Sequence, residues 1–402
     1  MRRIGLALAL CLLATPVMAD KIADGRYQSV LGDCEGCHTV PGGKPFAGGV
    51  VLETPFGKLV TSNITQDRQT GIGAWSEEDF RRAMKTGIAP GGKRLYPAMP
   101  YPAYARMSDT DVSALWAYMK SIAPVRNAVD TNGLRFPFNI RATLMVWNWL
   151  NFKPESFKPD PAKSAAWNRG AYLVTGPAHC GMCHTPKSLL GADKSSEALS
   201  GASLQGWFAP DITAHRITGV GGWSRDDIVR FLRTGWSRHG AASGPMAEAV
   251  ENSTSHMTDG DLNAIAVYLK DQAMPPRASG PALAKSDARM RTGVAIYRAN
   301  CVGCHGWDGA GQAMIFPPLA RVSVVQQASP ETLVRVVLAG ARAAQTRDAP
   351  TAPAMPSFAW RLNDRQVADV LTYIRNSWGN VAAPVAPDQV GAIRGRLQGA
   401  SR

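Results

Sequence analysis

Cysteine is scarce in this sequence, and none is left over for disulfide bonds. The 402 residues contain seven cysteines, and Cys11 lies in an apolar N-terminal segment that we expect to be removed. The other six are confined to three short CxxCH motifs. A disulfide-stabilised secreted scaffold is therefore excluded, although the N-terminus predicts an oxidising compartment.

Long apolar runs and clustered charge are also missing. After the N-terminal segment no stretch reaches the roughly 18 apolar residues that a membrane-spanning helix needs, so any membrane association is expected to be peripheral. The formal net charge is +13, but Lys and Arg are scattered instead of gathered on one element with interleaved aromatic residues. This distribution argues against nucleic-acid binding.

The N-terminal segment has the organisation of a secretory signal. Arg2 and Arg3 precede the apolar run 4–14, and small residues end at Ala19. We expect cleavage before Asp20 and export to the periplasmic side of the cell membrane.

Three CxxCH motifs are the strongest chemical signal in the chain. They contain Cys34, Cys37 and His38; Cys180, Cys183 and His184; and Cys301, Cys304 and His305. Two thiols at this spacing can bond the two vinyl groups of a porphyrin while the adjacent His reaches its iron. A redox dithiol would need a βαβ setting and a zinc site would need paired motifs, and neither pattern is found. The sequence thus predicts three covalently bound haem c groups.

The surroundings of the motifs recur as three repeats, which predicts a mainly α fold of three tandem domains. One shared helix begins after a serine cap and ends at a glycine: Ser76 and Gly87, Ser224 and Gly235, Ser329 and Gly340. A second shared helix is capped by Ser108, Thr258 and Asn363, each with Asp or Gln three residues later as in a capping box. Apolar residues follow a helical period in both.

The sixth ligand of each iron decides between electron transfer and small-molecule chemistry. Met99, Met246 and Met355 recur between the two shared helices and are the predicted distal metal ligands. Met107 and Met257 are rivals, but the third repeat has Leu362 there, which predicts a core position. His239 or His256 would instead make the second haem bis-His, and this alternative remains open. No separate catalytic constellation is found.

Two further stretches lie outside this pattern. Asn63-Ile64-Thr65 leads to Trp75 and Asp211-Ile212-Thr213 leads to Trp223 across glycine-rich loops, for which we expect a structural role, not phosphate binding. The segment 136–150 is apolar on nearly all sides and must be covered by a neighbouring domain, a partner subunit or a membrane surface.

These observations give a domain division. We expect a signal peptide at 1–19, cytochrome c domains at 20–125, 161–275 and 276–383, an apolar linker segment at 126–160 and a loose tail at 384–402.

The order of helices and motifs resembles class I cytochromes c, in which the first and last helices cross near the haem. This resemblance implies that Gly25 and Tyr27, Gly170 and Tyr172, and Gly293 and Tyr297 belong to such crossings. From Gly25 to Trp378 the chain is similar to the three-haem cytochrome c subunit of membrane-bound bacterial dehydrogenases for alcohols, gluconate, sorbitol, fructose or aldehydes. Met99-Pro100-Tyr101, the Asn63 loop and the 136–151 segment carry this likeness.

The resemblance implies an electron-transfer subunit with no substrate-oxidising site of its own. Its electrons would come from a catalytic subunit bearing pyrroloquinoline quinone, flavin or molybdenum and pass to ubiquinone or a terminal oxidase. A free periplasmic electron shuttle, and a multihaem peroxidase or thiosulfate-oxidising enzyme, are the competing functions.

Overall fold

The chain is described here by a computed structural model that covers residues 20–274 and 282–400. The expected signal segment, including Cys11, lies outside the described residues. The described chain forms two compact units, the first from 20–163 and 171–179 and the second from 164–170, 180–274 and 282–400. It is mainly helical with short strands, as the sequence predicts. No helix of the described part is long and apolar enough to cross a membrane.

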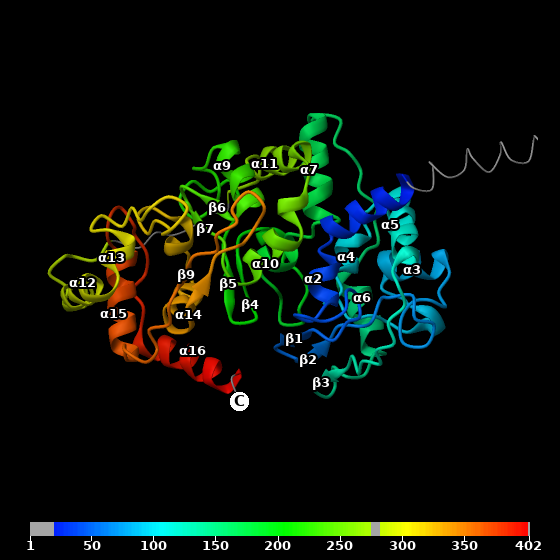
Figure 1. Ribbon diagram of the computed structural model, residues 1–402, viewed down its shortest axis with the longest axis horizontal. Coiled ribbons are helices and arrows are strands. Elements are labelled where there is room, and N and C mark those ends of the chain that lie inside the picture. Colours follow the sequence, from blue (N-terminus) through cyan, green and yellow to red (C-terminus); the bar gives the residue numbers. More distant parts are fainter. Residues whose placement is uncertain (1–19, 275–281, 401–402) are drawn as a thin grey trace, which may run out of the picture. The chain divides into compact units, whose positions relative to one another are not determined.

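The first unit contains the first CxxCH motif. A helix at 20–31 is followed by α2 (Cys34–His38), β1 (Val51–Thr54), β2 (Gly57–Val60), α3 (Glu77–Thr86), a 3-10 turn (Pro90–Gly92), α4 (Tyr101–Tyr104), α5 (Asp109–Ser121), β3 (Gly133–Leu134) and α6 (Thr143–Asn151) (Figure 1). The three strands form one antiparallel sheet in the order β1-β2-β3. Helix α7 (Ala165–Thr175) has residues in both units.

The second unit contains the other two motifs. Its first half has α8 (Gly181–His184), a 3-10 turn (Ser195–Glu197), β4 (Ala202–Leu204), β5 (Trp207–Ala209), α9 (Arg225–Thr234), β6 (Trp236–Ser237), β7 (Gly240–Ala241), α10 (Pro245–Asn252), a 3-10 turn (Thr254–His256) and α11 (Asp259–Leu269). Its second half has α12 (Ala288–Asn300), α13 (Val302–His305), a 3-10 turn (Ser323–Gln326), α14 (Glu331–Ala339), β8 (Ala341–Arg342), β9 (Ala354–Met355), α15 (Asp364–Arg375) and α16 (Pro387–Ala400). Four antiparallel strand pairs, β4-β5, β6-β7 and β8-β9 here and β1-β2 in the first unit, are local hairpins or loop closures.

The predicted caps position the shared helices. Ser76 and Ser224 each accept a hydrogen bond from the backbone three residues later and complete capping boxes with Asp79 and Asp227. Gly87 and Gly235 end these helices in left-handed conformation, which favours glycine. The third copy begins one residue later than expected, at Glu331, because Pro330 occupies the cap position.

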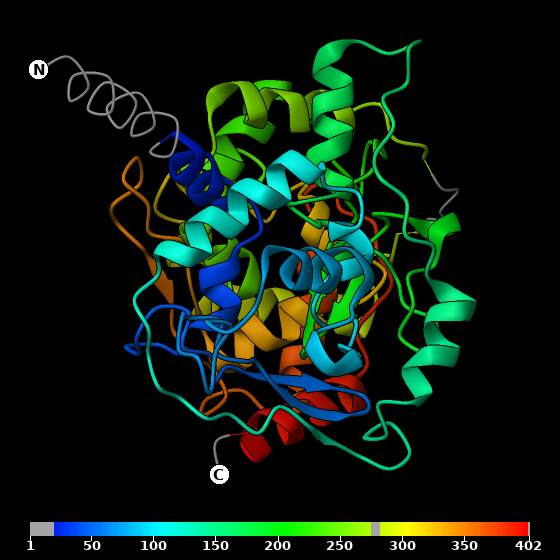
Figure 2. The same cartoon turned by 90° about the vertical axis from the view of Figure 1, so that its right-hand side faces the viewer.

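In each repeat, the helix before the CxxCH motif crosses the second shared helix closely, and a glycine at the crossing permits this approach. An added Cβ would lie 1.9 Å from the Ala114 carbonyl oxygen at Gly25, 2.0 Å from that of Ala264 at Gly170 and 2.3 Å from that of Asp369 at Gly293. Figure 2 shows the first of these crossings, where the blue N-terminal helix lies across the cyan α5. The crossings implied by the resemblance are therefore present in all three repeats, at the predicted glycines.

The second and third repeats pack together within the second unit. Gln327 donates from its amide to the Thr218 carbonyl at 2.7 Å, and its side-chain oxygen accepts from the Asp211 backbone at 3.3 Å. Thr332 exchanges hydrogen bonds with the backbone of Phe208, and the Arg335 guanidinium lies 4.8 Å from the Trp207 ring centroid. Gln327, Asp211 and Thr218 are all buried, so this contact lies in the protein interior and not at its surface.

The C-terminal segment differs from the loose tail that we expected after residue 383. Residues 387–400 form α16, and Val390 and Ile393 are buried in the apolar core of the third repeat. Arg394 bonds Asp364 and two backbone carbonyls at the start of α15. Val390, Ile393 and Leu397 follow a helical period that the intervening Gly and Arg residues obscured.

The apolar segment 136–150 is held by polar contacts and exposes its apolar side chains. Phe136, Met145 and Trp149 are 78%, 57% and 81% exposed, whereas Leu144 is buried. Most of the apolar side chains of this segment are therefore not covered by the first unit, to which the segment belongs. The other expectation, that the segment is an interaction surface, is taken up below.

Candidate haem-binding sites

The three motifs adopt the same local structure. Each His ends a short helix, and the two cysteines lie on the turn before it, so the two sulfurs and the imidazole project from one side of a single helical turn. The first cysteine of each motif is half-buried, and Cys37 and Cys304 are exposed. This geometry matches the two thioether bonds and one axial ligand predicted from the spacing.

Each motif His is oriented by a backbone carbonyl. Nδ1 lies 2.6 Å from the Ser62 oxygen in His38, 2.6 Å from the Pro210 oxygen in His184 and 3.0 Å from the Pro317 oxygen in His305. Because a carbonyl only accepts, Nδ1 carries the proton and Nε2 keeps a lone pair for a metal. Burial lowers the pKa of all three imidazoles, which favours this neutral form.

In each repeat, a glycine after the motif forms a backbone hydrogen bond to the motif histidine. Gly48, Gly201 and Gly311 donate their N–H groups to the carbonyls of the three motif histidines, at 2.7, 2.8 and 3.0 Å. All three glycines have positive φ, and a Cβ on Gly48 would lie 2.4 Å from the Ser62 backbone. These glycines and the acceptors Ser62, Pro210 and Pro317 were not predicted. They follow the motifs at different distances, so no constant spacing identified them.

Burial also sets the state of the unreacted thiols. It raises the pKa of Cys34 and Cys301 to about 11 and that of Cys180 to about 12. A buried thiol stays protonated near neutral pH and is a weak nucleophile and a weak metal ligand. Protonated thiols at these three positions argue against a zinc site.

The predicted distal methionines are all half-buried. Met99 lies in a tight turn before α4 and packs with Cys34 against one apolar cluster, which includes Phe46, Phe80 and Trp116. Met355 lies on β9 and packs with Cys301 against the core of the third repeat. In the first and third repeats, the first motif cysteine and the predicted methionine thus pack against one apolar cluster.

The second repeat is arranged differently. Met246 is the second residue of α10 and packs with Phe231 against a small cluster of Ala242, Ala247, Val250 and Ala344, which does not contain Cys180. Within the part of the chain that the structure describes, the cluster around Met246 is thus not shared with Cys180.

The rival ligands occupy other environments. Met107, Met257 and Leu362 are 1%, 3% and 6% exposed, in agreement with the core position that we predicted. His239 stacks on Trp223 with 4.6 Å between ring centroids, and its Nε2 lies 3.3 Å from Asp227. His256 Nε2 lies 2.9 Å from the Glu251 carbonyl oxygen. His179 Nε2 lies 3.1 Å from the Gly32 carbonyl oxygen.

The glycine-rich loops are closed by their own backbones. Thr65 O accepts from Ile72 and Thr213 O from Val220, both at 2.9 Å. Asn63 also donates to the Val125 carbonyl after α5. A Cβ on Gly73 would lie 2.0 Å from the Gln66 oxygen, so this close backbone turn requires glycine. The expected structural role agrees with these contacts.

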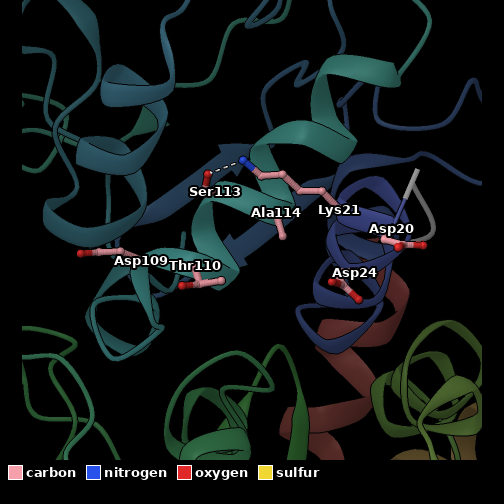
Figure 3. Close-up of a pocket in the computed structure, with 7 residues that line it drawn as sticks. All are labelled: Asp20, Lys21, Asp24, Asp109, Thr110, Ser113 and Ala114. Atoms are coloured by element: carbon pink, nitrogen blue, oxygen red, sulfur yellow. Dashed lines mark hydrogen bonds between the residues drawn. The ribbon is translucent and has the colours of Figure 1, made fainter. Parts of the chain in front are cut away.

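A surface hollow beside the first helix is unrelated to the motifs. Figure 3 shows it between that helix and α5, where Lys21 donates to Ser113 at 2.8 Å and Asp20, Asp24 and Asp109 lie at the rim. Most of the residues that line it are charged or polar in type, and none belongs to a CxxCH motif. The CxxCH regions remain the candidate sites.

Three helix crossings, three oriented histidines and paired thiols on one turn define a c-type cytochrome. A sequence model of the cytochrome c family matches residues 22–123 and 290–378. The gluconate 2-dehydrogenase cytochrome c subunit of Pantoea cypripedii is 40% identical over 97% of this chain and 94% of its own length. The chain belongs to the family of cytochrome c subunits of bacterial dehydrogenases, and it is an electron-transfer subunit with covalently bound haem c.

Other relatives serve different dehydrogenases. The alcohol dehydrogenase (quinone) cytochrome c subunit of Gluconobacter oxydans is 40% identical over 90% of this chain and 79% of its own length. The fructose dehydrogenase cytochrome subunit of Gluconobacter japonicus is 36% identical over 94% of this chain and 84% of its own length. A dehydrogenase catalytic subunit is therefore the partner class that the family defines.

Proposed function

We propose that this chain holds three haem c groups, one at each CxxCH motif, and relays electrons from a dehydrogenase catalytic subunit to ubiquinone or a terminal oxidase. The repetition of one oriented His and one locking glycine at all three motifs carries the proposal. Haem supplies reversible one-electron chemistry, and the chain supplies attachment, orientation and an apolar setting.

The proposed axial pairs are His38 with Met99, His184 with Met246 and His305 with Met355. A thioether is a soft ligand that suits haem iron and raises its potential. The clusters that join Cys34 with Met99 and Cys301 with Met355 support two of these pairs. The third rests on the repeat and on the engagement of His239 and His256 elsewhere.

The setting of the complex is part of the proposal. The chain would be exported, cleaved before Asp20 and associated with the periplasmic face of the cell membrane, where the quinone acceptor lies. The partner would carry pyrroloquinoline quinone, flavin or molybdenum. The names of the relatives, which include gluconate, alcohol and fructose dehydrogenases, support an alcohol, sugar acid, polyol or aldehyde substrate class.

Intact mass tests the haem count and the processing together. Protein from a strain competent in cytochrome c maturation is expected to carry three haem additions on a chain that starts near Asp20. Two additions or fewer would refute the assignment of one haem to each motif.

Conservative methionine variants test the ligands. Met99→Leu, Met246→Leu and Met355→Leu keep the side-chain volume but remove the thioether, so each is expected to remove about one third of the Met-to-iron charge-transfer band. Met107→Leu and Met257→Leu are matched controls at core positions and should keep the whole band. The reverse pattern would show that the repeats are misaligned.

Isolation with the partner tests the electron path. The complex is extracted from native membranes in mild detergent, and haem reduction is followed while alcohols, aldehydes, polyols and sugar acids are added. Reduction by one class, with a co-eluting dehydrogenase chain, is the expected result. A lone chain that no dehydrogenase reduces would favour a free shuttle, and peroxide turnover would favour an enzyme.

A further inference from the structure

The segment between β3 and α7 differs from an ordinary surface helix, because many of its apolar side chains face solvent while polar side chains face the protein. Its exposed apolar side chains, here called the α6 surface, are Phe136, Ile140, Met145, Val146, Trp149 and Leu150. Their exposed fractions range from 44% to 81%. Large apolar side chains gathered in this way on a soluble domain mark an interaction surface.

Polar contacts hold the inner side of this segment to the first unit. Asn148 in α6 accepts from the Tyr101 hydroxyl at 2.6 Å, on the same helical face as the buried Leu144. Arg141 donates to the Arg94 carbonyl at 2.7 Å and lies 4.5 Å from the Tyr96 ring centroid. Tyr96 in turn donates to the Phe138 carbonyl at 2.9 Å.

These anchors fix which face points outward. Residues 145, 146, 149 and 150 occupy the opposite side of α6 from Leu144 and Asn148, as the helical period requires. The segment can be followed from β3 to α6 in Figure 1. Hydrogen bonds to the first unit therefore hold this segment with its apolar face outward in the chain alone.

The charges around the α6 surface identify the occupant. Between Asp130 and Glu155 the sequence has no acidic residue but contains three cations, Arg135, Arg141 and Lys153. Arg135 and Lys153 are exposed and stand at the two ends of the apolar stretch. Exposed Trp, Phe and Leu bounded by cations without acids are the pattern of segments that lie in the interface of an anionic bilayer.

We propose that the α6 surface is where this subunit attaches to the membrane, with its apolar side chains among the acyl chains and Arg135 and Lys153 at anionic headgroup phosphates. The inference rests on the proposed function, since it places the subunit beside the quinone pool. It adds the element that makes the contact and the class of lipid that it recognises.

Vesicle flotation tests the apolar contribution. The purified full-length holoprotein is mixed with vesicles of phosphatidylethanolamine and phosphatidylglycerol. The double variant Trp149→Gln/Leu150→Gln should lower the bound fraction at limiting lipid by about tenfold or more, because two buried apolar side chains are lost from the interface. Leu189→Gln/Leu190→Gln removes two exposed apolar side chains outside the segment and is the matched control, expected to bind as the unaltered chain does.

Charge variants test the lipid class. Arg135→Gln and Lys153→Gln should each weaken binding to the anionic vesicles roughly fivefold and leave the weaker binding to phosphatidylcholine vesicles unchanged. Added salt should reduce the difference between the two vesicle types. All six substituted positions are exposed, and haem absorbance with thermal unfolding checks that the fold is intact.

Two results would overturn the proposal. One is unchanged vesicle binding in Trp149→Gln/Leu150→Gln, and if that variant also loses its dehydrogenase partner during purification, the α6 surface belongs to a protein interface. The other is an equal loss in the Leu189→Gln/Leu190→Gln control. Substrate-driven haem reduction in detergent is measured separately, so a failure of the electron path is distinguished from a failure of membrane attachment.

Discussion

At the scale of the residue, the helix crossings depend on the absence of a single methyl group. A Cβ on Gly170 would lie only 2.0 Å from the Ala264 carbonyl oxygen, so the two helices can pack this closely only because residue 170 is glycine. Gly170→Ala should therefore lower the free energy of unfolding by about 1–3 kcal/mol or more, because the helices must move apart. Urea unfolding of the holoprotein measures this.

The matched control is Gly260→Ala in α11, on the other helix of the same crossing. Gly260 is exposed, and its added Cβ would meet only Thr258 Oγ1 at 3.9 Å. This change should stabilise the protein by about 0.5–1 kcal/mol because alanine favours the helix. A loss of stability at Gly260 similar to that at Gly170 would contradict the steric explanation.

The same scale shows what sequence reasoning can reach. CxxCH, the crossing glycines and the core positions Met107 and Met257 carry recognisable side-chain signals, and each was predicted. The acceptors for His38, His184 and His305 are backbone carbonyls that lie 24, 26 and 12 residues away. Every residue has a carbonyl, so neither residue type nor constant spacing identifies Ser62, Pro210 or Pro317.

At the scale of the element, α16 shows how a weak pattern is missed. Its exposed positions carry Gly, Gln and Arg, which favour a loose tail, but Val390 and Ile393 are buried. Ile393→Ala should lower the free energy of unfolding by about 2–4 kcal/mol through the cavity that it leaves. Gln398→Ala, on the exposed side of the same helix, should have no comparable effect. Equal small effects would mean that α16 does not pack on the third repeat in solution.

The cap of α12 provides a pH-dependent element. Hydrogen bonds from Arg289 lower the pKa of Asp287 to about 2 from its usual 3.8. A lowered pKa in the folded state means that Asp287 stabilises the protein above about pH 4, and this contribution is lost as pH falls toward 2.

Asp287→Asn tests that pH dependence because asparagine caps a helix equally well but does not titrate. The stability advantage of the unaltered protein over the variant should be present at pH 6 and disappear near pH 2 in urea unfolding. A difference that is constant across this range would contradict the titration of Asp287.

At the scale of the whole molecule, three repeats of one architecture form two compact units. The repeats were visible in the sequence, but the packing of the second against the third was not. That packing depends on contacts of Gln327 and Thr332, which belong to no motif or periodic pattern in the sequence. Gln327→Ala would remove the hydrogen bonds that join its side chain to the Asp211 N–H and to the Thr218 carbonyl.

This change should destabilise the second unit by about 1–3 kcal/mol. Calorimetry should then show the third repeat melting apart from the second, whereas Gln345→Ala, an exposed position, should leave the transition unchanged. A single unchanged transition in Gln327→Ala would show that this hydrogen-bonded contact does not couple the repeats.

The glycine crossings also set an order of events during biogenesis. Each crossing joins the first helix of a repeat to its last, so it closes a long loop and is slow to form by chance encounter. The CxxCH turn lies inside that loop, and its first cysteine is half-buried in the folded repeat. We therefore expect haem attachment to be most efficient while the first and last helices of a repeat are still apart, before the folded repeat restricts access to its first cysteine.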